Sequence, residues 1–195
     1  RPCPVPGVAL RGGMNKTFRR GVNGALVDEF ERAIAQLAEL VLGLTDFEFE
    51  AVRDRETQDD DCRSIQTVVN HVVRAGYGHT NYIRLALAID GSRPDLELGS
   101  RAESVEQLAA MLSYLETTFE GRWEMTEKEM AAVEIHARWG PMFDLEQMLE
   151  HAIVHVLRHR RQIERFLTEP RFAAGDRPSP PRDFSPANRK EEERS

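Results

Sequence analysis

The sequence is poor in cysteine, in long apolar runs and in positive charge. Its two cysteines, Cys3 and Cys62, are too few for a disulfide framework, which favours a reducing compartment such as the cytoplasm. No apolar run approaches the ~20 residues that a membrane-spanning helix requires. The net charge of −7 provides no overall basic field for nucleic acid. We therefore expect a cytoplasmic protein that binds neither a membrane nor nucleic acid.

Several functional motifs are also missing. The chain has no internal repeat, no glycine-rich phosphate loop and no serine-hydrolase elbow. Residues 1–13 lack the apolar middle of a secretory signal, so we interpret them as a translated leader or a cloning remnant, with Met14 as a plausible natural start. No base lies beside Cys62 in the sequence, which favours an incidental cysteine over a reactive thiol.

What the chain does have is helical periodicity. Its 195 residues, 41% of them hydrophobic, suit one domain with a proper core. Apolar residues recur every three or four positions over 25–44, 62–89, about 104–120 and about 145–168. Four such helices with short and medium connections predict an all-α four-helix bundle over 14–170. Residues 171–195, rich in Pro, Arg, Asp, Ser and Glu, are predicted to form a disordered tail.

Local signals mark the helix ends. Asn23 is a candidate cap of the first helix, and Ser104–Gln107 and Asp144–Gln147 have the pattern of capping boxes for the third and fourth. The run Asp59–Asp61 could bind a hard cation, but capping of the second helix is the more common role of such carboxylates. Residues 122–141 carry two signals: Thr126–Glu129 could cap a short helix, whereas Val133, Ile135, Ala137 and Trp139 alternate with other residues, which predicts an extended chain. A segment of this kind often folds over a pocket mouth, and His136 within it is expected to be exposed.

The fourth predicted helix carries three histidines, His151, His155 and His159, at positions i, i+4 and i+8. The outer two start roughly 12 Å apart along the axis, so one ion can take only an adjacent pair and needs another ligand from elsewhere. From the centre of the apolar face, His159 lies roughly 40°, His155 about 80° and His151 about 120° around the helix. The pair His155/His159 therefore faces the core flank, whereas His151 leans toward solvent. The alternative is a set of boundary histidines on an amphipathic helix.

The second predicted helix offers two further histidines. His79 falls near the middle of its apolar face, where it could be a core histidine with its own hydrogen bond. His71 falls on a flank beside small residues, Ala75 and Gly78, which leave room for a pocket. Periodicity alone leaves open which of the two meets the fourth helix.

Two segments resemble a known family. Residues 64–77 (SIQTVVNHVVRAGY) look like the second helix of the DinB-like (YfiT-like) superfamily, and residues 155–163 (HVLRHRRQI) resemble its fourth-helix motif. The resemblance covers roughly Gly24 to Pro170. It implies a bundle with up-down-down-up helix order and one divalent metal held by His71, His155 and His159. Arg161 stands where glycine is common in the family, which would narrow the approach to the site.

The resemblance also implies function. Several family members resemble thiol S-transferases, which suggests a metal-dependent S-transferase of the detoxification or stress-response type, with a small-molecule substrate and a low-molecular-weight thiol. Three imidazoles leave open positions on zinc, nickel or iron. The alternatives are a metal-dependent hydrolase and a non-catalytic metal-binding stress protein that acts through dimerisation, so we allow for a homodimer. Catalytic residues stay unassigned, with Glu150, Tyr82 and His151 as candidate general bases.

Overall fold

The computed structural model describes residues 17–92 and 94–168. Four long helices dominate these residues: α1 (Gly21–Leu42), α3 (Ile65–Ala86), α4 (Arg101–Thr118) and α6 (Leu145–Thr168). Shorter elements connect them: α2 (Asp46–Glu50), η1 (Asp60–Cys62), α5 (Glu127–Ala131), β1 (Ile135–His136) and β2 (Met142–Phe143). The predicted all-α bundle is confirmed. The predicted leader and disordered tail lie outside the described residues. None of the described helices is long and apolar enough to cross a membrane.

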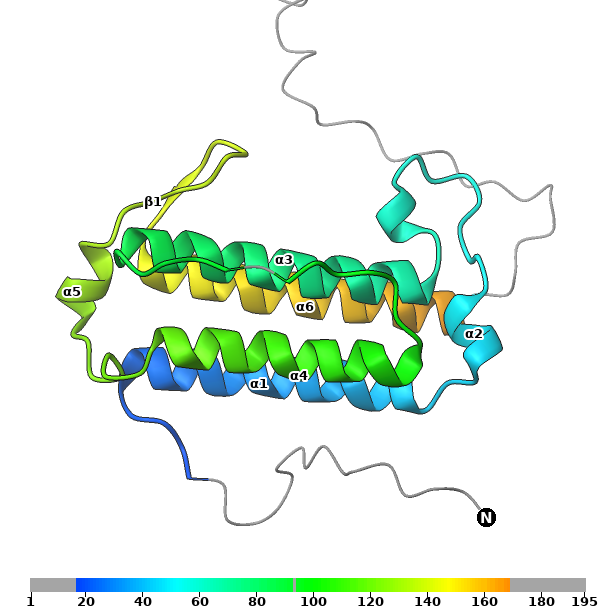
Figure 1. Cartoon of the computed structure of the whole chain (residues 1–195), viewed down its shortest axis with the longest axis horizontal. Helices are drawn as coiled ribbons and strands as arrows, with labels where there is room; N and C mark the ends of the chain where they lie inside the picture. Colours follow the sequence, from blue (N-terminus) through cyan, green and yellow to red (C-terminus); the bar gives the residue numbers. More distant parts are fainter. Residues whose placement is uncertain (1–16, 93, 169–195) are drawn as a thin grey trace, which may run out of the picture.

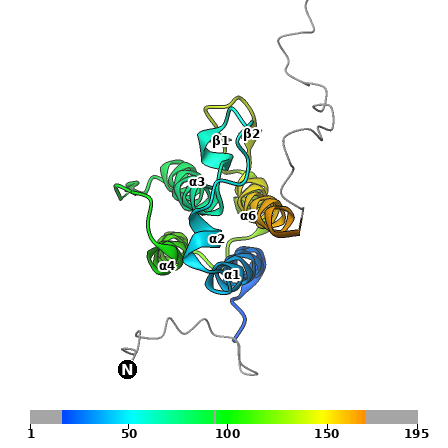
Figure 2. The same cartoon turned by 90° about the vertical axis from the view of Figure 1, so that its right-hand side faces the viewer.

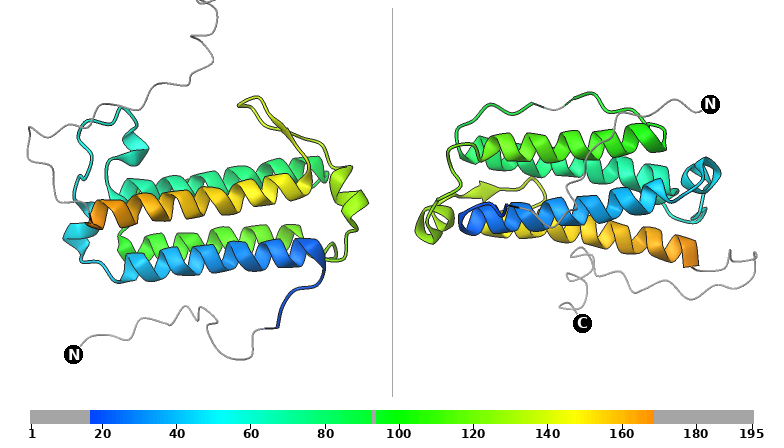
Figure 3. Two further views of the ribbon diagram at one scale, coloured as in Figure 1. Left: turned by 180° about the vertical axis from the view of Figure 1, so that it is seen from behind. Right: turned by 90° about the horizontal axis from the view of Figure 1, so that it is seen from below.

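The four long helices stand at the corners of a square, with α1 opposite α3 and α4 opposite α6 (Figure 2). In Figure 1, α1 and α6 run from left to right, whereas α3 and α4 run from right to left. The order along the chain is therefore up-down-down-up, as the resemblance implied. The neighbours α1 and α6 are parallel (Figure 3), and the neighbours α3 and α6 are antiparallel.

Two parallel neighbours in sequence need a long return connection. The chain from α3 to α4 runs back along the bundle (Figure 1), which lets α4 start at the same end as α3. Side chains of α3 hold this connection in place: Asn70 donates to the carbonyl of Glu97 (3.2 Å), and Gln66 donates to the carbonyl of Gly99 (2.9 Å). The side-chain amides of Asn70 and Gln66 thus satisfy backbone carbonyls that have no partner within a regular helix or strand.

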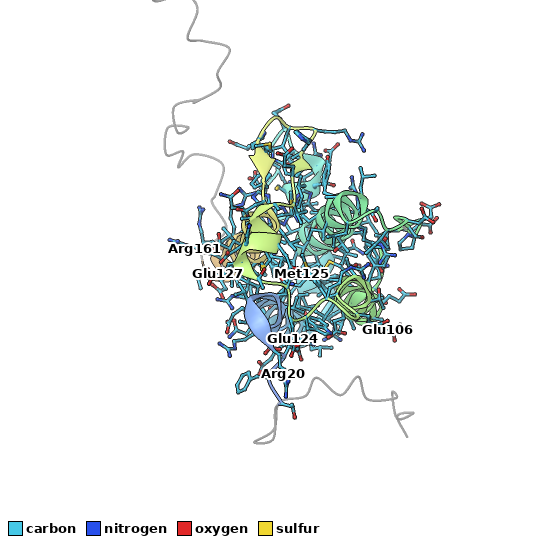
Figure 4. All side chains as sticks on the ribbon, turned by 90° about the vertical axis from the view of Figure 1, so that its left-hand side faces the viewer. Arg20, Glu106, Glu124, Met125, Glu127 and Arg161 are labelled. Atoms are coloured by element: carbon cyan, nitrogen blue, oxygen red, sulfur yellow. The ribbon has the colours of Figure 1, made fainter. Side chains whose placement is uncertain are left out.

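Two predicted helix starts were wrong. Helix α1 begins at Gly21, so Asn23 is not a cap but a buried residue whose amide donates to the Arg122 carbonyl at 3.0 Å. At this end of the bundle the exposed side chains of Arg20 and Glu124 lie close together (Figure 4), 3.3 Å apart. Helix α4 is capped by Ser100, with Glu103 completing the box, so the predicted cap Ser104 lies inside the helix. In both cases a side chain that suits a cap is buried against a neighbouring element instead.

The predicted box at the start of α6 is confirmed. The Asp144 carboxylate accepts from the Gln147 backbone at 2.8 Å, and the Gln147 side chain accepts from the Asp144 backbone at 3.0 Å. Helix α3 starts in the same way, with Ser64 as its cap. These two caps fix where α3 and α6 begin, and so fix which residues of the two antiparallel helices lie opposite each other.

Two segments rise from the α3–α6 side of the bundle, one toward each end (Figures 1 and 2). The first carries η1. The backbone amides of Arg53 and Asp54 donate to the Arg63 carbonyl (2.8 and 3.1 Å), which folds residues 51–63 back against the start of α3. The second is the β1–β2 hairpin, in which Ile135 pairs with Phe143 and His136 with Met142. The predicted cap at Thr126 is confirmed, since Thr126 and Glu129 form a capping box at the start of α5. The extended part of the segment is a hairpin, and His136 is exposed, as expected.

Candidate metal centre

Three histidines from two helices meet between α3 and α6. His155 and His159 lie on successive turns of α6, and His71 of antiparallel α3 faces both, with ring centroids 5.1 and 4.8 Å away. One ligand nitrogen from each histidine lies within 4.8 Å of the other two. Within residues 17–92 and 94–168, this is the one group of three or more potential metal ligands that the geometry brings so close. It is the set that the resemblance implied.

The distances suit a tetrahedral ion. The Nε2 atoms of His71 and His155 are 3.2 Å apart. Two ligands bound about 2.0 Å from a tetrahedral ion lie about 3.3 Å from each other. The Nε2 atom of His159 is buried and has no hydrogen-bond partner, although buried polar atoms almost always have one. A divalent ion shared by the three nitrogens would satisfy this buried atom.

The opposite ring nitrogens are held by other residues. Nδ1 of His71 lies 3.1 Å from a carboxylate oxygen of Asp61, and Nδ1 of His159 lies 2.9 Å from the side-chain oxygen of Gln162. Both partners are acceptors, so each Nδ1 donates, and each Nε2 keeps its lone pair free for a ligand bond. Histidines that bind metals in proteins are held in this way. Arg74 donates to the second Asp61 oxygen at 3.0 Å, which fixes the carboxylate.

The surroundings favour the neutral form of His155 and His159. Burial, followed by the neighbouring His159, lowers the pKa of His155 to about 2. Burial also lowers the pKa of His159, although the hydrogen bond that His159 donates to Gln162 acts in the opposite direction. A neutral imidazole is the form that binds a metal, so the site is prepared for an ion at neutral pH without first losing a proton.

His79 lies next to this group but outside it. It is buried, 7% exposed, as its place on the apolar face predicted. Its contacts are with rings: His155 at 5.3 Å, His151 at 5.0 Å and Trp139 at 6.0 Å between centroids. Burial lowers its pKa to about 4, so this histidine is neutral as well. The structure therefore separates the two α3 histidines as the resemblance implied, with His71 facing the α6 pair and His79 in the adjoining layer.

An aromatic cluster continues from His79 to the hairpin. We use the name hairpin cluster for Tyr82, Trp139, Phe143 and His151. The Trp139 indole stacks on the His151 ring (5.8 Å between centroids, 26° between planes) and meets the Tyr82 ring edge-on at 5.3 Å. His151 is half-buried by these rings, so the prediction that it leans toward solvent holds only in part. Sequence reasoning placed a pocket cover here but gave Trp139 no role of its own.

The other candidate residues have plainer positions. Of the proposed bases, Tyr82 and His151 lie in the hairpin cluster, whereas Glu150 is exposed on α6. Arg161 is exposed and points away from α3 (Figure 4), so the prediction that it narrows the approach was wrong. It follows His159 by two residues, a rotation of about 200° that carries it to the opposite side of the helix.

Burial raises the pKa of the Cys62 thiol, which fits an unreactive cysteine.

The acidic run next to the centre has divided roles. Asp59 caps η1 by accepting from the Asp61 backbone at 3.0 Å, as the capping interpretation expected, although the capped element is a short 3-10 helix and not α3. Asp60 pairs with Arg63 at 2.7 Å. Asp61 alone turns toward the histidines. The run is not a cation site of its own, and one of its members supports His71.

Comparison with known proteins identifies the fold. No protein-family model matches this sequence, and no curated protein matches it significantly. Among solved structures, the chain is similar to YfiT from Bacillus subtilis, with a TM-score of 0.59 and 14% sequence identity over 82% of this chain and 96% of that one. YfiT is described as a probable metal-dependent hydrolase with an unusual four-helix bundle topology. At this identity the likeness establishes the fold, which agrees with the YfiT-like resemblance of the sequence.

Proposed function

From the YfiT-like fold of this chain we propose that it is a metal-dependent enzyme acting on a small molecule, with His71, His155 and His159 as the ligands of one divalent transition metal. The observation that carries this proposal is the buried, unpartnered Nε2 of His159, which lies within 4.8 Å of the other two ligand nitrogens. Zinc and nickel suit three imidazoles best, and iron is compatible with them.

The protein's own residues prepare the site in three ways. Asp61 and Gln162 fix the ring orientation and the tautomer of two ligands. The Asp61 carboxylate also compensates part of the charge that an ion brings between the helices. The side chain of His71 is 27% exposed, so the centre is accessible from the side on which η1 and the hairpin rise. Such an ion, when bound with an open position, lowers the pKa of a coordinated water or thiol and so yields a nucleophile near neutral pH.

Hydrolysis is the reaction we favour first. YfiT is described as a probable metal-dependent hydrolase, and this chain has its fold. Among the carboxylates of the described residues, Asp61 is the one that hydrogen-bonds to a histidine of the centre, and it is engaged by His71 and Arg74. A nucleophile generated by the metal alone is consistent with that arrangement.

Transfer of a low-molecular-weight thiol is the second candidate. Arg74 lies beside Asp61 with its side chain 42% exposed, so a guanidinium at the edge of the site is available to the carboxylate of such a thiol. The α6 arginines Arg158, Arg161 and Arg165 are exposed. A thiol transferase would therefore recruit its cosubstrate through α3 and not through the last turns of α6.

One set of assays tests the proposal. Purified protein is analysed for bound transition metals, then incubated with a panel of chromogenic esters and amides, and separately with low-molecular-weight thiols and a chromogenic electrophile. Each assay is run with and without a chelator and on the His155→Ala variant. We expect metal in about one equivalent per chain and a chelator-sensitive activity in one panel. Protein without metal that takes up none on reconstitution would refute the proposal, and a metal-loaded but inert protein would support the non-catalytic alternative.

A further inference from the structure

We propose that the space between the three histidines and the hairpin cluster binds a flat, uncharged aromatic group of the substrate, with Trp139 as the residue that selects it. This inference rests on the proposed metal centre, since it places the aromatic group next to the atoms that the ion would activate. It names the substrate class that the metal centre alone leaves open.

The first observation is a stripe along α3 that has two small residues in its middle. His71, Ala75, Gly78 and Tyr82 lie within about 60° of one another around the helix axis, so they form one band along it. His71 belongs to the metal centre at one end, and Tyr82 touches Trp139 at the other. Between them, a Cβ atom added at Gly78 would have no heavy atom within 4 Å. The stripe is therefore open over its middle.

The second observation is a continuous series of rings from α6 and α3, which we call the ring wall. His159, His155 and His151 occupy three successive turns of α6, and His79 of α3 contacts both His155 and His151. The rings thus continue without a break from the metal centre to Trp139. Aromatic rings prefer partners at centroid distances of roughly 4.5–7 Å, so a ligand ring next to this wall finds favourable contacts along its whole length.

The third observation is the state of Trp139 itself. The residue contacts four rings and nevertheless remains 49% exposed. It is not required as the anchor of the hairpin, because Ile135 and Ala137 are buried there and the Tyr82 hydroxyl accepts from the Arg138 backbone at 3.1 Å. His151 covers one face of the indole by stacking, which leaves indole surface for a further ring.

Charge selects against other ligands. The stripe and the ring wall themselves contain no carboxylate, ammonium or guanidinium group. Charged groups lie around them: Asp61 and Arg74 are at the His71 end, and the charge of Arg158 on α6 lowers the pKa of His151, His155 and His159. Over the middle of the stripe, at Gly78, a polar group would lose its hydration without a hydrogen-bond partner from the stripe or the rings. A planar apolar group loses only unfavourable contact with water.

The test uses two hydroxamates that share a metal-binding head. Acetohydroxamate carries a methyl group and benzohydroxamate a phenyl ring. Binding to the cobalt-loaded full-length protein is followed by the visible absorption of Co²⁺ and by calorimetry. We expect benzohydroxamate to bind roughly tenfold more tightly than acetohydroxamate, which corresponds to the stacking and burial of one ring.

Variants assign that difference to Trp139. Trp139→Ala should bring the two hydroxamates within about threefold of each other while leaving acetohydroxamate affinity and metal content unchanged. Met142→Ala is the matched control, because Met142 is 60% exposed on the same hairpin, pairs with His136 and makes none of these ring contacts. It should keep the tenfold preference.

A second variant tests the space without touching the hairpin. Gly78→Leu should weaken benzohydroxamate selectively, because its side chain would enter the open part of the stripe, whereas Gly78→Ala should not. Both variants are expected to fold, because alanine and leucine form helices more readily than the glycine that they replace in α3.

The outcomes separate the two proposals. Failure of both hydroxamates to bind the metal-treated protein would overturn the metal centre and this inference with it. Binding of both with equal affinity, or a tenfold preference that survives Trp139→Ala and Gly78→Leu, would overturn the inference and leave the metal centre intact. A change of oligomeric state in Trp139→Ala without loss of the preference would assign Trp139 to contact with a second copy of the chain.

Discussion

His71 and His155 face each other across the bundle with their Nε2 atoms 3.2 Å apart, although 84 residues separate them in the sequence. Their meeting depends on the antiparallel pairing of α3 with α6 and on the caps at Ser64 and Asp144, which set the start of each helix. It depends as well on the rotation of α3 about its own axis. That rotation turns His71 toward the α6 pair and places His79 one layer away.

The first prediction follows from this rotation. His71→Ala should reduce the metal content sharply, because the two remaining ligands on α6 cannot complete a set of three. His79→Ala should leave the metal content intact and lower the free energy of unfolding by a few kcal/mol at most, since it removes a buried ring. Metal analysis after gel filtration, together with thermal unfolding, distinguishes the two effects. Loss of metal from His79→Ala alone would mean that α3 presents the other histidine.

The second prediction concerns Asp61. Asp61→Asn keeps the shape of the side chain but removes the charge and allows the amide to present a donor to His71. We expect metal affinity to fall roughly 10–100-fold, the usual effect of losing a residue that orients a ligand histidine. Competition with a fluorescent chelator measures it. Asp60→Asn is the control, because Asp60 pairs with Arg63 at 2.7 Å and its side chain is 85% exposed. The metal affinity of this variant should stay within about twofold of the wild-type value.

Asp61 also illustrates what the sequence could and could not predict. The bundle, the α6 cap and the histidine pair on α6 follow from periodicity and spacing, which act within one helix. The link from Asp61 to His71 spans a loop whose path is set by the bonds of Arg53 and Asp54 to the Arg63 carbonyl, and no local pattern encodes it. Capping was the reasonable expectation for such a run, and it holds for Asp59.

Trp139 was missed for a related reason. It lies in a short hairpin whose strands pair over two residues each, a structure too small to be stable by itself. Its position is determined by contacts with Tyr82 of α3 and His151 of α6, which come together only in the folded bundle. The errors at Asn23 and Ser104 have the same origin, because tertiary burial of a polar side chain competes with its tendency to cap a helix.

The third prediction concerns pH. His79 has a pKa of about 4 in the folded protein, mainly because it is buried, against about 6.5 in the unfolded chain. Between these two pKa values the unfolded state binds more protons than the folded state does. The contribution of neutral His79 to the free energy of unfolding is therefore complete above about pH 6.5 and is lost as the pH falls toward about 4. From pH 7 to pH 5 this one histidine should cost the metal-free protein about 2 kcal/mol. His155, with its lowered pKa, acts in the same direction.

Urea unfolding of chelator-treated protein at several pH values measures this effect. His79→Gln is the control, because glutamine does not titrate, and its stability should fall less steeply between pH 7 and pH 5. A wild-type protein as stable at pH 5 as at pH 7 would contradict the burial that the structure assigns to His79.

The fourth prediction compares two glycines on one helix. A Cβ atom at Gly76 would overlap the side chain of Met111, where α3 and α4 pack against each other, whereas one at Gly78 would meet open space. Gly76→Ala should therefore cost roughly 1–3 kcal/mol through overpacking. Gly78→Ala should gain up to about 1 kcal/mol, because alanine is the better helix former.

Thermal unfolding of the two variants should show the melting temperature lowered by roughly 5 °C in Gly76→Ala and unchanged or raised in Gly78→Ala. The comparison controls for helix propensity, since the same substitution is made two residues apart. A loss of stability in both variants would place packed atoms over Gly78, and the open stripe between His71 and Tyr82 would then have no room for a ligand. A loss in Gly76→Ala alone would support both the close contact of α3 with α4 and the free space beside the three histidines.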